Sequence, residues 1–343
     1  MTWELAGHRI GDGGALVVVA EIGLNHGGDP ARALELVDAA ASGGASAVKL
    51  QTLRGDRLVD PSAPAPAHVH VASLQAFFAS FELDEGAHRA LAQRARRHGL
   101  GFLSTPFDED AVDMLVRVGV DALKIASGDI THHRLIAAAA RTGLPLIMST
   151  GMSELPDIDA AVACARGHGN ARLALLHCVS AYPTPDDQQE LGAISALAQR
   201  YGVPVGLSDH SSYPHAAAIA TALGASIYER HLIRSADDDA IDAPVSSTPD
   251  DLRRVVAEAA GVRRALGTGM KHCGRAEAVN RHASRRGVFA VRDLRDGEAL
   301  GEADVRMLRP ETAVAASAWP TIIGRRVRRA VSAGSPLSLD DLE

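Results

Sequence analysis

The lysines of this chain are the first residues that point to chemistry. Only three of its 35 basic residues are lysine, and two of these, Lys49 and Lys124, lie inside short apolar runs. A lysine ammonium is a compact point charge that suits phosphate, and its pKa shifts readily when it is buried. Two such lysines predict either a site for a small anion or a lysine that forms a Schiff base with a carbonyl.

Hydroxyl and acidic side chains lie at the ends of other apolar runs of the same kind. They are Glu21, Thr105, Ser127, Ser149, Tyr182 and Ser208. Hydroxyls and backbone N–H groups can complete a cradle for an anion that carries phosphate and carboxylate. The abundance of hydroxyls favours the anion site, while the residues alone leave the Schiff-base alternative open.

Two histidines indicate a metal site. His210 and His231 end neighbouring apolar runs, so their imidazoles can converge on one ion and leave positions for water and substrate. Asp209 and Glu229 are placed to hydrogen-bond to these imidazoles. The ligand types suit Mn²⁺, with Mg²⁺ or Co²⁺ as alternatives. Two hydrogen-bonded core histidines are the competing interpretation.

The other histidines and cysteines give no site of their own. His68 and His70 are expected in a loop. Cys164 and Cys178 are expected as small core residues, because no base is placed to activate either thiol.

The elements that must position these residues follow from the apolar pattern. Strands are predicted at 17–23, 47–51, 101–106, 122–127, 144–150, 171–179, 203–209 and 226–232. Amphipathic helices are predicted between them, for example at 30–44, 84–99, 108–119 and 249–267, and nearly every helix stops at a glycine.

This alternation predicts a closed parallel TIM (β/α)8 barrel with the helices outside. An open doubly wound sheet is the alternative, but it would need a glycine-rich dinucleotide loop after its first strand. In a barrel the active site lies at the carboxyl ends of the strands, where the residues above are placed.

The chain is predicted to have two domains. Residues 1–267 form the catalytic barrel, 268–283 a polar linker, and 284–343 a small second domain with turn signals and no helical periodicity. A long segment after the second strand includes the Pro/Ala-rich stretch 61–67, which we expect to form a wall over the site.

The composition excludes several classes of protein. The 343 residues are 46% hydrophobic and 22% charged, as in ordinary globular proteins, and the net charge of −7 gives no basic footprint for nucleic acid. Three cysteines are too few for a disulfide framework, and the chain begins without a signal-peptide pattern. We expect a reduced, cytoplasmic protein that binds neither nucleic acid nor membrane.

A series of motifs, in order along the chain, resembles the sialic acid synthase (N-acetylneuraminate synthase) family. The motifs are Glu21-Ile-Gly-Leu-Asn25-His26, Val48-Lys49-Leu-Gln51-Thr52, Ser104-Thr105-Pro-Phe-Asp108, Lys124-Ile-Ala-Ser127-Gly-Asp129, Ser149-Thr150-Gly-Met, His177-Cys-Val-Ser-Ala-Tyr182-Pro-Thr-Pro, Gly206-Leu-Ser208-Asp209-His210 and Glu229-Arg-His231. The resemblance implies a TIM barrel followed by a small antifreeze-like (SAF, β-clip) domain.

The resemblance also implies a reaction. The family condenses phosphoenolpyruvate with an open-chain hexose such as N-acetylmannosamine or a related sugar, depends on a divalent metal, and releases phosphate by C–O cleavage. The residues implied to hold phosphoenolpyruvate are Lys49, Thr105, Lys124, Ser127, Ser149 and Ser208. His210 and His231 are implied as metal ligands.

Further roles are implied for catalysis and for the sugar. The implied catalytic residues are Glu21, Lys124 and Asp129, of which Asp129 stands where the family has an acid proposed to deprotonate water. The implied sugar-binding residues are Glu21, Ser180, Tyr182, Asp242 and Arg309. Arg309 would act across a domain-swapped homodimer, because the second domain of the family reaches the neighbouring subunit.

The chain departs from the family pattern at three places, all on the sugar side. Ala240-Ile-Asp242-Ala243 stands where the family usually has Gly-Pro-Asp-His, Glu311 replaces a glycine after Arg309-Pro310, and Ser180 replaces an asparagine found in some members. These changes suggest retained chemistry with an altered acceptor. A non-catalytic sugar-binding paralogue is the alternative.

Overall fold

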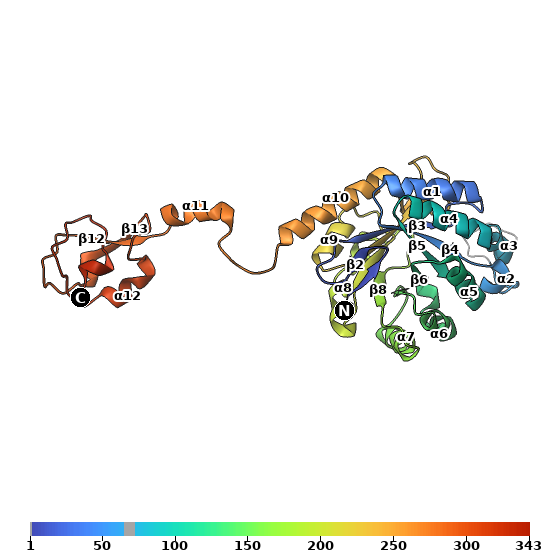
Figure 1. The fold of residues 1–343 in the computed structure, drawn as a ribbon, viewed down its shortest axis with the longest axis horizontal. Helices are drawn as coiled ribbons and strands as arrows, with labels where there is room; N and C mark the ends of the chain where they lie inside the picture. Colours follow the sequence, from blue (N-terminus) through green and yellow to red (C-terminus); the bar gives the residue numbers. More distant parts are fainter. Residues whose placement is uncertain (1, 65–72) are drawn as a thin grey trace. The chain divides into compact units, whose positions relative to one another are not determined.

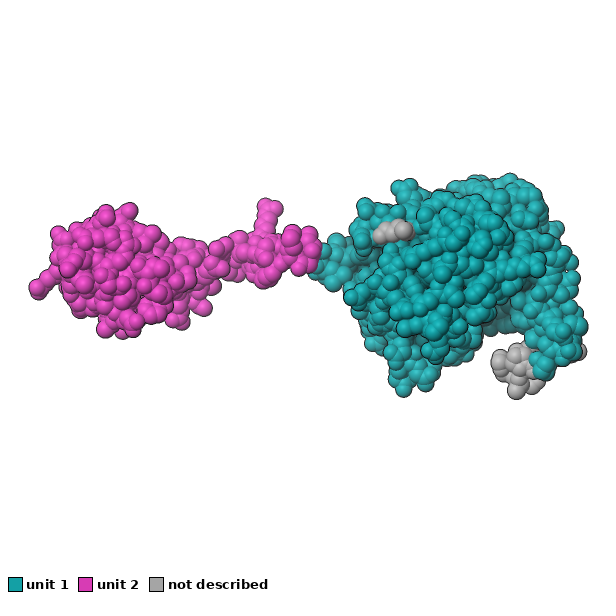
Figure 2. Space-filling view, turned by 90° about the horizontal axis from the view of Figure 1, so that it is seen from below, with its two compact units in different colours: residues 1–267 teal, residues 268–343 magenta. Residues whose placement is uncertain are grey.

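A computed structural model of the protein describes residues 2–64 and 73–343. The chain divides into two compact units, Met1–Gly267 and Thr268–Glu343, which are coloured separately in Figure 2. Among the described residues, no helix is long and apolar enough to cross a membrane.

The first unit is the predicted TIM barrel (Figure 1). Its eight parallel strands are β3 Val17–Gly23, β4 Ala47–Thr52, β5 Gly101–Pro106, β6 Ala122–Ile125, β7 Leu146–Ser149, β8 Leu173–Cys178, β9 Val205–Asp209 and β10 Ile227–Leu232. Each strand pairs with the next, and β10 pairs with β3 to close the barrel. A two-residue strand, β11 Ser246–Ser247, extends the sheet beside β10.

Helices surround the barrel and bury their apolar faces on the strands. They are α1 Pro30–Ser42, α4 Glu85–Arg97, α5 Glu109–Val118, α6 His133–Arg141, α7 Leu155–Gly167, α8 Ala193–Tyr201, α9 Ala216–Ala222 and α10 Pro249–Leu266. The predicted helix-ending glycines are confirmed where they are needed most. Gly119 and Gly202 cap α5 and α8 in the left-handed conformation, which glycine adopts at little cost and which returns the chain to the sheet.

A hairpin that the sequence analysis did not predict closes the amino-terminal end of the barrel. Strands β1 Trp3–Leu5 and β2 His8–Ile10 pair antiparallel across a tight turn at Ala6 and Gly7, both with positive φ. Trp3, Leu5 and Ile10 are buried in one cluster with residues from the inside of the barrel. The three-residue strands are too short to show a clear alternating pattern in the sequence.

The segment between β4 and α4 contains two short helices, α2 Gly55–Leu58 and α3 Leu74–Ala79. The stretch 61–67, predicted to form a wall over the site, lies partly outside the described residues, and His68 and His70 lie wholly outside them.

The second unit has its own small apolar core. Helix α11 Arg275–Ser284 precedes an antiparallel pair, β12 Gly287–Ala290 and β13 Val305–Leu308, and the short helix α12 Trp319–Ile322. The core includes Val288, Leu300, Val314, Ile322 and Val327. This unit is the predicted small, loop-rich second domain.

The predicted polar linker 268–283 is not simply a connecting loop. It contains most of α11, which begins after Gly274, where the backbone N–H donates to Glu277 Oε1 at 2.8 Å. This local cap satisfies an amide that would otherwise lack a partner at the helix start, so a polar sequence with few apolar residues still forms a helix.

Candidate functional site

The carboxyl ends of the barrel strands surround a cavity of about 370 Å³. The predicted residues that line it are Glu21, Lys49, Thr105, Lys124, Ser127, Ser149, Ser180, Tyr182, Ser208, His210 and His231. They come from seven of the strands and the segments that follow β6, β8 and β9. The barrel therefore brings together residues that are up to 210 positions apart in the sequence.

Four buried charged groups form the floor of this cavity. Glu21 is paired with the Lys49 ammonium. The Glu229 carboxylate lies between the lysines, with Oε2 3.9 Å from Lys49 Nζ and Oε1 3.8 Å from Lys124 Nζ. Ser208 Oγ donates to Glu229 Oε1 at 3.0 Å. Two lysines and two carboxylates balance one another, which is how charge is tolerated in a buried site.

The pKa values of these groups differ because their partners differ. Burial raises the pKa of Glu21 to about 7, against the opposing effect of Lys49. Burial also disfavours ionised Glu229, but Lys124 and Lys49 outweigh it and lower the pKa of that carboxyl. Burial lowers the pKa of Lys124, which Glu229 only partly offsets. In Lys49 the two carboxylates outweigh burial and raise the pKa.

The hydroxyls beside the lysines are arranged as acceptors and donors for a ligand. Ser149 Oγ is buried and has no hydrogen-bond partner within the described part of the chain. Lys49 Nζ donates to Thr105 Oγ1 at 3.1 Å, and Ser127 Oγ accepts from the Gly151 N–H at 3.0 Å. A Cβ on Gly151 would lie 2.4 Å from Ser180 Oγ and 2.8 Å from Ser127 Oγ, so a larger residue there would displace these hydroxyls. These groups fit the predicted cradle for an anion.

The two predicted metal ligands lie side by side. The ring centroids of His210 and His231 are 5.5 Å apart, and the Tyr182 ring lies 4.2 Å from that of His210. His210 Nδ1 lies 3.2 Å from the Val179 carbonyl, to which it donates, so Nε2 carries the free lone pair. This tautomer leaves Nε2 of His210 available to a metal ion.

His231 is held against the backbone of β3. The β3–β4 register shifts between Glu21 and Gly23, and a Cβ on Gly23 would lie 3.1 Å from the His231 ring. His231 Nδ1 is buried without a hydrogen-bond partner, although Asp242 Oδ2 lies 3.4 Å away. An unpartnered imidazole nitrogen beside a carboxylate suits a cation.

The donor set therefore fits a divalent cation with open positions. Two imidazoles converge, one has its tautomer set by a backbone carbonyl, and the other has an unpartnered nitrogen. Within residues 2–64 and 73–343, no group of three or more His, Cys, Asp or Glu side chains forms a complete metal cage. Such a sparse set leaves room for substrate oxygens and water.

Three predicted site residues are not in the lining of the cavity. Asp242 lies behind His231, and its backbone N–H donates to Asn25 Oδ1 at 2.9 Å. Asp129 ends the single 3₁₀ turn Ser127–Asp129 after β6, where burial raises the pKa of its carboxyl. Arg309 follows β13 in the second unit.

The structure places three residues differently from the sequence-based expectation. Asp209 was expected to hydrogen-bond to a histidine, but it pairs with Arg230. Glu229 was expected to support a histidine, but it lies between the two lysines instead. Cys178 was expected in the core without a base nearby, yet it lines the cavity with its Sγ 3.8 Å from His210 Nδ1. Cys178 ends β8, and Glu229 lies two residues before His231 on β10, so closeness to the carboxyl end of a strand was the available signal.

Comparisons with known proteins agree with the motifs. Residues 36–271 match the NeuB family, and residues 285–343 match the SAF domain. The chain is 34% identical to the N,N'-diacetyllegionaminic acid synthase of Legionella pneumophila, over 95% of this chain and 94% of that protein. It is 31% identical to the pseudaminic acid synthase of Helicobacter pylori, over 95% of this chain and 97% of that protein.

A solved structure has the same architecture. The N-acetylneuraminic acid synthetase of Leptospira borgpetersenii is 32% identical, with a TM-score of 0.75, and the match covers 82% of this chain and 95% of that one. The family resemblance predicted from the motifs is confirmed.

Proposed function

The chain belongs to the NeuB family, and we propose that it condenses phosphoenolpyruvate with an open-chain hexose, N-acetylmannosamine or a related sugar, in a metal-dependent reaction that releases phosphate by C–O cleavage. The relatives named above are synthases of nonulosonic acids. The observation that carries the proposal is one cavity that holds two lysines, six hydroxyl side chains and two adjacent imidazoles.

Phosphoenolpyruvate would bind on the lysine side of the cavity. Lys49 and Lys124 supply positive charge to its phosphate and carboxylate. Thr105, Ser127, Ser149 and Ser208 supply hydroxyls around them, and the unpartnered Ser149 Oγ is the group most ready to bond a new ligand. A bound anion would neutralise the charge of the two lysines, so Lys49 and Lys124 would depend less on Glu21 and Glu229 as ion-pair partners.

The sugar would bind on the histidine side. His210 and His231 would hold a divalent cation, Mn²⁺ with Mg²⁺ or Co²⁺ as alternatives, and the bound ion would polarise the acceptor aldehyde as a Lewis acid. Glu21, Ser180, Tyr182 and Asp242 would contact or orient the sugar. Arg309 would reach it from the neighbouring subunit of a domain-swapped homodimer.

The reaction would proceed by addition and elimination. The methylene carbon of phosphoenolpyruvate forms a bond to the aldehyde carbon while the aldehyde C=O π bond breaks, and the aldehyde oxygen takes up a proton to become a hydroxyl. Positive charge develops at the phosphate-bearing carbon, and Glu21 stabilises this charge. Water adds there and Asp129 accepts its proton. The bond from this carbon to the phosphate oxygen then breaks, the hydroxyl that came from water loses its proton to the leaving phosphate, and the ketone of the product forms. The raised pKa of Asp129 strengthens it as a base.

The test is phosphate release from phosphoenolpyruvate with Mn²⁺ and a panel of free and phosphorylated hexoses, with the products weighed by mass spectrometry. We expect a product heavier than one acceptor by a pyruvate unit. Lys124→Met is the matched control, because it keeps the side-chain length and removes the charge. Phosphoenolpyruvate binding without phosphate release for any acceptor would contradict the proposal and favour the non-catalytic alternative.

A Schiff-base aldolase is the second candidate, because the pKa of Lys124 is lowered by burial. Borohydride added with the substrates separates the two reactions. The proposed condensation leaves no adduct on Lys124 or Lys49 and is inhibited by a chelator. A trapped lysine adduct, formed equally well in the presence of chelator, would replace the condensation with the aldolase.

A further inference from the structure

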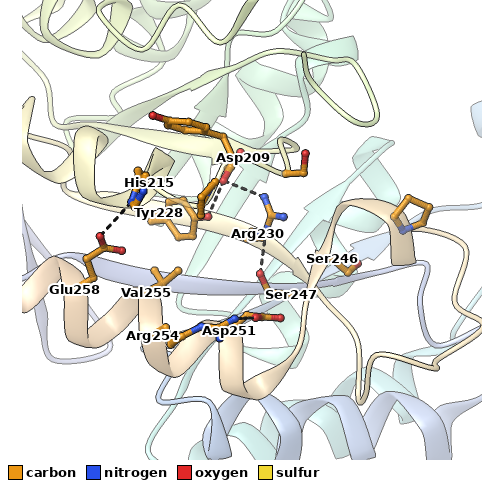
Figure 3. Close-up of a pocket in the computed structure, with 14 residues that line it drawn as sticks. Asp209, His215, Tyr228, Arg230, Ser246, Ser247, Asp251, Arg254, Val255 and Glu258 are labelled. Carbon is orange, nitrogen blue, oxygen red and sulfur yellow. Dashed lines mark hydrogen bonds and ion pairs between the residues drawn. The ribbon is translucent and has the colours of Figure 1, made fainter. Parts of the chain in front are cut away.

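The outer face of β9 and β10 carries a buried ion pair that the proposed reaction does not use. Arg230 Nη1 lies 2.9 Å from Asp209 Oδ2, and the two side chains are only 12% and 4% exposed. Figure 3 shows the pair beside a second cavity of about 640 Å³, on the flank of the barrel next to α10.

Arg230 contacts two separate segments of the chain, the end of β9 with the residues just after it, and β11. Besides Asp209, its Nε donates to Ser247 Oγ on β11 at 2.9 Å, and its Nη1 donates to the Ser211 carbonyl at 2.5 Å. The planar guanidinium has several donors in a fixed geometry, so one side chain can hold both segments together. Figure 3 shows the bonds to Asp209 and Ser247.

Both oxygens of the Asp209 carboxylate, the other member of the pair, accept further hydrogen bonds. Its Oδ1 accepts from the Ser211 N–H at 2.8 Å and from Ser211 Oγ at 2.7 Å. Its Oδ2 accepts from Tyr228 OH at 2.7 Å in addition to Arg230. The residues before and after His210 are therefore both bonded to this cluster.

The position of the pair in the sheet connects it to the histidines. Arg230 and Asp209 are the last residues at which β10 and β9 are in register, and each immediately precedes a histidine. Because side chains alternate between the faces of a strand, the ion pair points outward where the next residues point into the barrel. His210 and His231 are thus the residues that immediately follow the two members of the outward-facing ion pair.

We propose that Asp209 and Arg230 are a positioning pair that sets the spacing and orientation of the His210 and His231 imidazoles for one shared divalent cation. This inference rests on the proposed function for the metal itself. It adds that the geometry of the two ligands is determined on the outside of the barrel, by an ion pair that does not contact the substrate.

The test is metal binding by Arg230→Lys, which keeps the charge and loses the planar set of donors. We expect the Kd for Mn²⁺, followed by the EPR signal of free Mn²⁺, to weaken roughly 10- to 100-fold, as is usual when the supports of metal ligands are removed. The visible absorption bands of bound Co²⁺ should change as well. The Kd for phosphoenolpyruvate should change less than about twofold, because the lysines are bonded to other groups.

Two further variants separate positioning from general loss of stability. Tyr228→Phe removes one bond to Asp209 and should weaken Mn²⁺ binding about three- to fivefold in a protein that still folds. Arg263→Lys is the matched control. Its Nη2 bonds the Ala225 carbonyl at 2.7 Å, at the other end of β10. This variant should lower the melting temperature without changing the Kd for Mn²⁺ or the Co²⁺ bands.

The outcomes distinguish this inference from the proposed function. Wild-type binding of Mn²⁺ with an unchanged Kd and unchanged Co²⁺ bands in Arg230→Lys and Tyr228→Phe would overturn the positioning role alone. An equal loss of Mn²⁺ affinity in Arg263→Lys would also overturn the positioning role, because the loss would then result from lowered stability of the fold. A wild-type protein that binds no divalent cation would overturn both, and phosphate release that continues in chelator would identify the metal assignment as the error.

Discussion

At the residue scale, the site is a set of buried charges that compensate one another. Burying an ion without a partner is very costly, and here each lysine has a carboxylate within 4 Å. His231 Nδ1, Ser149 Oγ and Glu21 Oε1 are buried in the site without a hydrogen-bond partner among the described residues. Unpartnered buried polar atoms destabilise a protein, so their presence at strand ends favours a ligand that bonds them.

His231→Ala tests the metal assignment directly. Removing one of two imidazole ligands should lower metal-dependent phosphate release roughly 100-fold or more, because the ion loses half of its protein donors. Turnover over a Mn²⁺ titration measures the effect, and His98→Ala, an exposed histidine paired with Asp38 at 2.7 Å, is the control. Unchanged turnover in His231→Ala would remove His231 from the metal site.

At the element scale, the junction between β3 and α1 is fixed by a neutral histidine. The Gly28 N–H donates to His26 Nδ1 at 3.0 Å, which requires an unprotonated nitrogen. Burial, with a further effect from His88, lowers the pKa of His26 to about 4. Gly28 itself is confined, since a Cβ there would lie 2.1 Å from the Ser80 carbonyl.

This junction predicts a pH dependence of stability. The unfolded chain takes up a proton on His26 near its ordinary pKa of 6.5, whereas the folded chain does so only near 4. The free energy of unfolding should therefore fall as the pH falls from about 6.5 to 4, by up to about 3 kcal/mol from this group.

The matched variant is His26→Asn, whose Oδ1 can still accept from Gly28 and does not titrate. Urea unfolding at several pH values should show a shallower loss of stability in this variant than in the wild type. Identical pH slopes in the two proteins would contradict the assignment of this dependence to His26.

The amino-terminal hairpin is the second element with a measurable contribution. Trp3 is buried in the cluster inside the barrel, and its indole N–H lies 3.4 Å from the Leu173 carbonyl. Trp3→Ala should lower the free energy of unfolding of the barrel by about 3–5 kcal/mol. Calorimetry measures the loss in free energy of unfolding. Trp319→Ala is the control, because it affects the core of the second unit. A barrel transition left unchanged by Trp3→Ala would mean that the hairpin does not stabilise the barrel.

At the scale of the whole molecule, two compact units must cooperate if Arg309 contacts the sugar. Arg309→Ala should then raise the KM for the acceptor and leave the KM for phosphoenolpyruvate unchanged, because only the sugar side loses a donor. Steady-state kinetics with each substrate varied measures the difference. An unchanged acceptor KM would argue against a role of the second unit in the site.

The proposed domain-swapped homodimer has a separate test in mixed dimers. The Arg309→Ala and Lys124→Met chains would be coexpressed. In each mixed dimer the Arg309→Ala chain supplies an intact barrel, and the Lys124→Met chain supplies an intact second unit. If the units exchange between subunits, roughly a quarter of the wild-type activity should return at low acceptor concentration. Activity no higher than that of the separate variants would show that each site is built from one chain.

The sequence by itself determined the barrel and most of the charged and hydroxyl side chains that line its cavity. Apolar runs separated by amphipathic helices and terminal glycines identify eight parallel strands, and a barrel necessarily gathers their carboxyl ends in one place. For that reason Lys49, Lys124, His210 and His231 could be assigned to one cavity before any distance was known.

Only the tertiary structure decided how those residues are partnered. Glu229 lies between two lysines, Cys178 faces His210, and Asp209 joins Arg230 on the outer face of the barrel. The amino-terminal hairpin enters the barrel from its other end. Periodicity tells which face of a strand a side chain occupies, but pairing depends on the spacing of strands that are distant in the chain, and no local pattern encodes that spacing.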